Sequence, residues 1–477
     1  MQVTRLPLSS TTSRVATREL PFLLLILWVF GLAIADPPAA QVLVILHPTV
    51  IDVTGAQAVP DQAVIIIGER ITNIANAGTI ELPINARILD ATGKFLIPGL
   101  WDMHVHTLGK GWPESSFRAF IQNGVTGVRD MGSPLAALDD VDRFRKQIEA
   151  GSLVGPRLVV AGPVVDGPMP MFPELSIAVS SPFEARQAVK ELQARGADFI
   201  KVYSLLPRDA YFAIANEAKR RDISFSGHVP ESISALEASD AGQKSIEHLS
   251  GVRLACSTRE PELRKELIDA RAKADAALLY RVLRNAYARS RETYDENKAQ
   301  FLFARFVEND TWQVPTLVVS RFVAQVNKNR NQRVGLASDS VELRRDPCVN
   351  NFTSDEFELI GAAADNAFDL VGKMRRAGIK FMAGTDTPNP FVNPGQSLHD
   401  ELELLVHAGF TPKEVLQSAT RNPAEYLGLL DILGTVEKGK AADLILLDAN
   451  PLEDIKNTRK IWAVISRGRL FEKASID

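Results

Sequence analysis

The stretch Ile97-Pro98-Gly99-Leu100-Trp101-Asp102-Met103-His104-Val105-His106 decides the fold class of this chain. Its apolar run carries Asp102, His104 and His106 at alternate positions, and alternate side chains of a strand lie on the same face. Imidazole nitrogens bind zinc and similar divalent ions. Two imidazoles on one strand face therefore supply half of a metal site, although an isolated H-x-H pattern is a weak signal.

Further potential ligands follow other short apolar runs: Lys201, His228, His248 and Asp386. Each has an ordinary alternative, such as a lysine that extends to solvent, a structural histidine or an aspartate in a turn. Their common position at the ends of apolar runs favours a single metal centre. This order of residues indicates a metal-dependent hydrolase with a barrel fold.

Apolar strand candidates recur along the chain with helical stretches between them. The helical stretches include 182–195 and 207–221. After the first strand, the candidates are 124–130, 157–162, 198–203, 223–228, 245–249, 312–319 and 379–384. This alternation predicts an α/β fold, a (β/α)8 TIM barrel, in which loops at the carboxyl ends of the strands carry the chemistry.

The chain resembles the amidohydrolase superfamily, whose first barrel strand ends in a Pro-Gly-hydrophobic-x-Asp-x-His-x-His pattern. Three later motifs resemble its imidazolonepropionase-like and Xaa-Pro dipeptidase-like branch: Leu398-His399-Asp400-Glu401-Leu402, Ala408-Gly409-Phe410-Thr411-Pro412 and Ala419-Thr420-Arg421-Asn422-Pro423-Ala424. The resemblance implies two divalent ions, with zinc expected. His104, His106 and Asp386 would hold one ion and His228 and His248 the other, and Lys201 would bridge both as a carbamate formed with carbon dioxide.

The family resemblance also implies a discontinuous β-sandwich beside the barrel, because short strands joined by turns occur near both ends of the chain. We expect a first sandwich part at 36–95, the barrel at 96–430 and a second sandwich part at 431–477. A helical insertion at about 256–350 interrupts the barrel. It would either cover the rim as solvated helices or act as a lid that limits substrate size.

Further residues are candidates for catalysis or support. Asp386 would also act as the general base, and Tyr203 would donate to the oxyanion unless it is a core tyrosine. Asp102 and His399 would orient neighbours of the metal ligands. Arg129 could bind a substrate carboxylate, and a structural ion pair is the alternative.

The predicted function is hydrolysis of an amide or peptide bond by a metal-activated hydroxide, with a dipeptide or N-acyl amino acid as substrate. Imidazolonepropionase itself is expected to use one metal without a ligating lysine, so Lys201 argues against that activity. Lactone or ester hydrolysis, deamination and a non-catalytic binding role remain alternatives.

Composition and the amino terminus bear on location and partners. The 477 residues are 45% hydrophobic with a net charge of −4, which is typical of a globular protein and does not indicate a nucleic-acid partner. A small-molecule partner is expected, and a homo-oligomer stays open. Residues 1–35 combine arginines, an apolar run and a small-x-small site, which predicts a signal peptide, export and no membrane contact after cleavage.

The alternative for residues 1–35 is an uncleaved anchor that holds the protein at the membrane. Export into an oxidising compartment would permit a disulfide between Cys256 and Cys348, the two cysteines of the chain. Two free thiols are the alternative.

Overall fold

The computed structural model describes residues 42–472, apart from 56, 110–112, 274, 275, 320, 322–366 and 390. The expected signal peptide and Cys348 lie outside the described residues, so cleavage, anchoring and the disulfide stay predictions. Cys256 is buried. Within the described part of the chain, no helix has both the length and the apolar character needed to cross a membrane.

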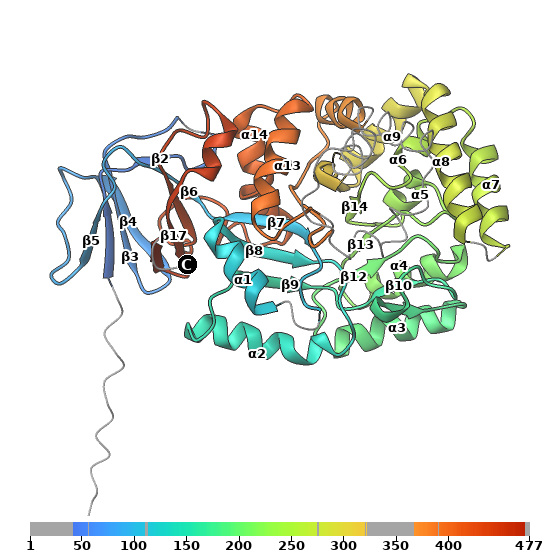
Figure 1. The fold of residues 1–477 in the computed structure, drawn as a ribbon, viewed down its shortest axis with the longest axis horizontal. Helices are drawn as coiled ribbons and strands as arrows, with labels where there is room; N and C mark the ends of the chain where they lie inside the picture. The colour runs from blue at the N-terminus through green and yellow to red at the C-terminus, as the bar shows by residue number, and fades with distance from the viewer. Residues whose placement is uncertain are drawn as a thin grey trace, which may run out of the picture. The chain divides into compact units, whose positions relative to one another are not determined.

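Parallel strands form the barrel predicted from the sequence (Figure 1). One sheet contains β7, β8 and β9, and a second contains β10 to β15, with β11 at its edge. The strands are β7 (Leu100–Val105), β8 (Val125–Asp130), β9 (Arg157–Val160), β10 (Val164–Asp166), β11 (Ser176–Ala178), β12 (Ile200–Val202), β13 (Phe225–Gly227), β14 (Ser245–Glu247) and β15 (Trp312–Val314). β9 and β10 follow each other closely and join the two sheets.

The segment that contains Asp386 closes the barrel. Met382 N donates to Gln313 O at 3.0 Å, and Met103 N donates to Ala383 O at 2.9 Å. Here the sequence predicted a continuous strand at 379–384, whereas the structure has isolated bridges to β15 and β7. The architecture is nevertheless an α/β barrel with additional strands from both ends of the chain, as predicted.

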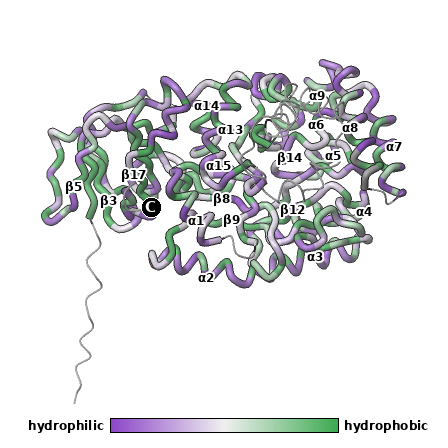
Figure 2. Tube along the Cα trace, viewed as in Figure 1, coloured by the Kyte–Doolittle hydropathy of each residue, from purple (hydrophilic) through white to green (hydrophobic). Residues whose placement is uncertain are grey.

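Helices surround the barrel strands. They are α1 (Pro113–Gln122), α2 (Ala137–Ala150), α3 (Pro182–Ala194), α4 (Arg208–Arg220), α5 (Ala235–Asp240), α6 (Val252–Ala255), α13 (Gln396–His407), α14 (Pro412–Ser418) and α15 (Arg421–Tyr426). In α3, the Ser181 side chain caps the first turn by accepting from Glu184 N. α2 alternates hydrophobic and hydrophilic residues along its length, as expected for a helix with one buried face (Figure 2). The helices predicted at 182–195 and 207–221 are confirmed as α3 and α4.

The insertion after α6 contains three helices in its described part: α7 (Glu260–Arg271), α8 (Ala276–Glu292) and α9 (Glu296–Glu308). Helix α9 buries Leu302, Phe303 and Phe306 in the main core of the barrel. Helices α7 and α8 instead pack together around a separate small cluster that includes Leu263 and Leu267. The helical prediction is confirmed for these residues, whereas a lid role stays a prediction.

Strands from both ends of the described chain form two further sheets beside the barrel. They are β1 (Val42–Leu46), β2 (Thr49–Val50), β3 (Gln62–Ile67), β4 (Arg70–Asn76), β5 (Arg87–Asp90), β6 (Phe95–Pro98), β16 (Leu444–Leu447), β17 (Ile461–Ser466) and β18 (Arg469–Glu472). One sheet has the order β4-β3-β1-β5, and the other has the order β18-β17-β16-β6-β2. Antiparallel pairing of β6 with β16 joins the two ends, and one buried apolar cluster contains residues of both sheets.

Candidate metal centre

Four imidazoles converge at the carboxyl ends of the barrel strands. His104 and His106 come from the end of β7, and His228 and His248 directly follow β13 and β14. The ring centroids of His104 and His248 are 4.5 Å apart, those of His104 and His106 are 5.3 Å apart, and those of His228 and His248 are 4.9 Å apart. The structure therefore brings together side chains that are far apart in the sequence, as predicted.

We call His104, His106 and Asp386 the first half-site. Asp386 Oδ1 lies 3.3 Å from His104 Nε2 and 3.1 Å from His106 Nε2. One potential ligand atom from each of the three residues lies within 4.8 Å of the other two. Burial favours a raised pKa for Asp386, but the imidazoles of His248 and His104 outweigh it and hold this pKa well below its usual range. The half-site thus combines two imidazoles with an ionised carboxylate.

We call Lys201, His228 and His248 the second half-site. Lys201 is fully buried on β12, and among the described residues neither its Nζ nor His228 Nε2 has a hydrogen-bond partner. Burial lowers the pKa of the lysine to about 8. Burial also lowers the pKa of His228 well below its ordinary value and that of His248 to about 3. A buried amine and a buried imidazole nitrogen that make no hydrogen bond among the described residues are unusual in a protein interior unless a ligand completes them.

The second ring nitrogen of every imidazole has a partner. The Nδ1 contacts are His104 to Glu247 Oε2 at 2.8 Å, His106 to Gly132 O at 2.8 Å, His228 to Ser204 Oγ at 2.8 Å and His248 to Thr316 Oγ1 at 2.6 Å. A carbonyl or carboxylate oxygen can only accept, so Nδ1 of His106 and of His104 carries the hydrogen. Their Nε2 atoms keep the lone pair that a metal ion requires, and the donor set fits divalent metal ions.

Backbone conformation contributes to this geometry. His248 and Asp386 have positive φ values of 59° and 63°, which are uncommon for residues other than glycine. Such strain is often found at functional sites. Gly384 allows the last strand to approach β7, because a Cβ atom there would lie 2.9 Å from His104 Cβ and 2.6 Å from Val314 Cγ1.

Asp102 connects the first and last barrel strands. Its carboxylate accepts hydrogen bonds from Thr385 N at 3.0 Å, Thr385 Oγ1 at 2.6 Å and His104 N at 3.2 Å. Burial raises its pKa to about 7. The carboxylate therefore holds the backbone beside His104 and Asp386, and its orienting role toward the metal ligands stays a prediction.

Arg129 is buried inside the barrel, where its guanidinium donates to four protein groups. It donates to Met103 O at 2.7 Å, Ser245 Oγ at 3.0 Å and Tyr426 Oη at 2.9 Å, and to both oxygens of Glu247 at 3.0 and 3.1 Å. These contacts match the structural ion pair, the alternative at the sequence level, and leave no donor for a substrate carboxylate. Sequence reasoning missed Glu247, although an acidic residue inside the buried strand before His248 was a signal.

Tyr203 and His399 occupy different surroundings. The half-buried Tyr203 ring stacks on His228 with centroids 4.1 Å apart, so it lies at the second half-site. His399 instead bonds through its two ring nitrogens to Thr458 Oγ1 at 2.9 Å and Asn123 O at 3.1 Å. Its predicted role beside the metal ligands is therefore corrected, because these bonds hold α13 against the 3-10 helix Ile455–Arg459 and the end of α1.

Comparison with known proteins agrees with this site. A family profile described as the Amidohydrolase family matches residues 95–471, which is most of the chain. The chain belongs to this family. It is a hydrolase that acts on carbon–nitrogen bonds and has a metal-binding His-His-Asp site, formed by His104, His106 and Asp386.

Individual relatives are distant. Ochratoxinase from Aspergillus niger is 24% identical over 447 residues, which covers 80% of this chain and 76% of the relative. A crystal structure of a prolidase candidate from Bifidobacterium longum superposes with a TM-score of 0.68 at 24% identity, covering 91% of this chain and 95% of that one. A Xaa-Pro dipeptidase crystallised with methionine in its active site gives a TM-score of 0.66 at 22% identity, covering 91% and 100%. At these identities the superpositions establish the fold alone.

Proposed function

We propose that this amidohydrolase is a binuclear enzyme that cleaves the amide bond of dipeptides or N-acyl amino acids. The observation that carries the proposal is the fully buried Lys201 Nζ, which makes no hydrogen bond within the part of the chain that the structure describes. It is close enough to Asp386, His228 and His248 to interact with them electrostatically. Among the described residues this amine makes no hydrogen bond, whereas a carboxylated amine would complete both half-sites.

Carboxylation of Lys201 needs only carbon dioxide as a co-reactant. The lone pair of the neutral amine attacks the carbon of carbon dioxide, a C=O electron pair moves to oxygen, and the nitrogen releases one proton to water. Burial favours the neutral amine that this step requires. The product is a carbamate, so the side chain ends in a negatively charged group with two oxygens in place of the ammonium group of lysine.

The remaining roles belong to residues at the two half-sites. Two divalent ions, for which zinc is our expectation, would lower the pKa of a shared water and polarise the scissile carbonyl. Asp386 would accept the proton of the water and return it to the leaving amine. Tyr203 would donate its hydroxyl hydrogen to the carbonyl oxygen, because its ring lies directly against His228.

The names of the relatives support the proposed substrate class. A prolidase candidate, a Xaa-Pro dipeptidase and ochratoxinase share the fold. We also propose export after removal of residues 1–35 and pairing of Cys256 with Cys348. Lactone or ester hydrolysis and deamination are the alternatives that the same scaffold allows.

The test combines metal analysis with substrate screening. Purified protein should hold about two divalent ions per chain, and it should release a free amino acid from a dipeptide or N-acyl amino acid library. Lys201→Ala should lose metal and activity, and Lys201→Glu should recover metal because its carboxylate replaces the carbamate. Ammonia as the product, or a metal content that is the same in Lys201→Ala, would contradict the proposal.

A further inference from the structure

The four imidazoles of the metal centre differ in what holds their Nδ1 atoms. His106 donates to a backbone carbonyl, while His228 and His248 contact the hydroxyls of Ser204 and Thr316. Of the four, His104 alone is held by a carboxylate, that of Glu247 at 2.8 Å. The first half-site therefore has a charged group behind one of its imidazoles, whereas the imidazoles of the second half-site contact hydroxyl groups.

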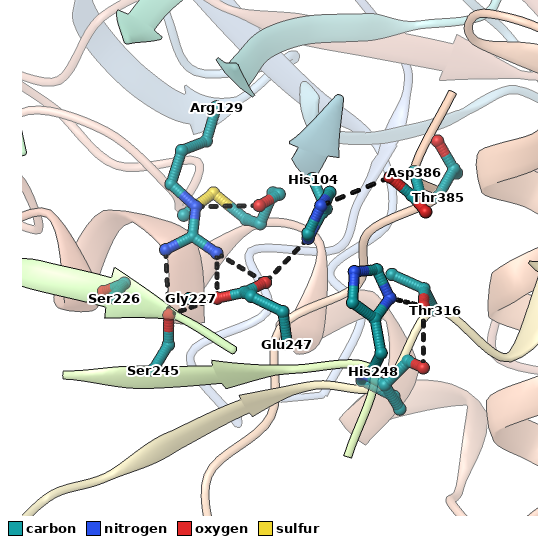
Figure 3. Close-up of polar contacts among 12 residues, drawn as sticks. His104, Arg129, Ser226, Gly227, Ser245, Glu247, His248, Thr316, Thr385 and Asp386 are labelled. Atoms are coloured by element: carbon teal, nitrogen blue, oxygen red, sulfur yellow. Dashed lines mark hydrogen bonds and ion pairs between the residues drawn. The ribbon is translucent and has the colours of Figure 1, made fainter. Parts of the chain in front are cut away.

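Glu247 is itself held from several sides (Figure 3). Arg129 donates to both carboxylate oxygens at 3.0 and 3.1 Å, and Ser245 Oγ donates to Oε1 at 2.5 Å. The side chains of His104, Glu247 and Arg129 are all fully buried. A buried carboxylate in this setting has little freedom to rotate, so it presents Oε2 to His104 in one orientation.

Arg129 also fixes the strand that carries the imidazole. Its Nε donates to Met103 O at 2.7 Å, immediately before His104 in the sequence. The same guanidinium therefore fixes the backbone next to His104 and the carboxylate against the His104 ring. Arg129 thus supports the orientation of His104 Nε2 in two ways, through the backbone and through Glu247.

We propose that Glu247 is a positioning residue for the ion of the first half-site, with Arg129 as its anchor. An acceptor carboxylate fixes the tautomer of a ligating imidazole and makes its free nitrogen a stronger ligand. The inference rests on the proposed binuclear function. It adds that the imidazoles of the two half-sites are supported differently. A carboxylate contacts His104 in the first half-site, and hydroxyl groups contact His228 and His248 in the second.

The test measures the affinity of each ion in the full chain by competition of zinc with a chelator. Glu247→Gln should weaken the first half-site by about 10- to 100-fold, which is typical when the partner of a ligating histidine is lost. Ser204→Ala, the matched change at His228, should weaken the second half-site instead. Tyr426→Phe removes another hydroxyl that contacts Arg129 but touches no imidazole, so it should leave both affinities unchanged.

Folding is checked separately, because Glu247→Gln leaves Arg129 without its charged partner. Glu247→Asp keeps the negative charge but shortens the side chain, so it should fold and still lose affinity at the first half-site. The absorption spectrum of the cobalt-loaded protein should change in both Glu247 variants and not in Tyr426→Phe. Two ions bound with wild-type affinity in Glu247→Gln and Glu247→Asp would overturn this inference alone. A wild-type chain that binds no divalent ion would overturn it together with the proposed function.

Discussion

The first and second half-sites differ in how their charges are balanced. In the first, Asp386 contacts both imidazoles and Glu247 supports His104, so the protein itself supplies the negative charge. In the second, His228 and His248 are held by hydroxyl groups, and no described residue forms a hydrogen bond with Lys201 Nζ. The first half-site therefore contains a carboxylate from the chain, whereas the second would, as proposed above, gain its negative charge from a carbamate on Lys201.

Removing the carboxylate of the first half-site should have the largest effect. Asp386→Asn removes the anion shared by His104 and His106 as well as the proposed general base. Loss of a general base alone lowers kcat by about 10²- to 10⁴-fold, and loss of a ligand adds to this. Steady-state kinetics with metal analysis would check it, and a variant that keeps both activity and the first ion would remove Asp386 from the mechanism.

A smaller effect is expected at the edge of the second half-site. Tyr203→Phe keeps the ring that stacks on His228 and removes only the hydroxyl. If this hydroxyl binds the oxyanion, kcat should fall by about 10²- to 10³-fold with little change in KM or in bound metal. An unchanged kcat would mean that Tyr203 is a packing residue and that the second half-site has no oxyanion donor at this position.

The smallest effect concerns His399, which belongs to neither half-site. Burial lowers its pKa from 6.5 to about 4, so the unfolded chain binds the proton more tightly than the folded chain. Its stabilisation is complete above about pH 6.5 and is lost as the pH falls towards 4, by about 3 kcal/mol in total. Denaturant unfolding across this pH range should show a shallower loss in His399→Gln than in the wild type. Equal slopes would show that His399 does not contribute to acid sensitivity.

The convergence of the candidate metal ligands could be predicted from sequence because each lies at or just after the end of an apolar run and belongs to a recognisable motif. His104 and His106 share one strand face, and Asp386 lies in a short turn motif at the last strand. The partners of these ligands were harder to predict. Glu247 and Arg129 are 118 residues apart in the sequence, and nothing local in either segment indicates that they form a pair.

His399 is a second residue whose contacts could not be predicted from its local sequence. Its motif resembles the family and suggested a place near the site, yet its contacts are with Asn123 and Thr458. The last barrel strand is a third example, because its apolar run predicted a regular strand and the structure has isolated bridges. The neighbouring strands determine how far backbone hydrogen bonding continues along a segment. The local residue pattern of that segment carries no information about these neighbours.

The sequence by itself determined the alternation of strands and helices, the order of the ligands and their chemical types. These properties depend on local periodicity and on residue chemistry, which are both present in the chain as written. Only the tertiary structure decided that Arg129 contacts Glu247, that Glu247 contacts His104 and that Lys201 Nζ makes no hydrogen bond with a described residue. The burial of a side chain and the identity of its hydrogen-bond partners depend on which distant segments come into contact. The packing of the whole barrel determines those contacts.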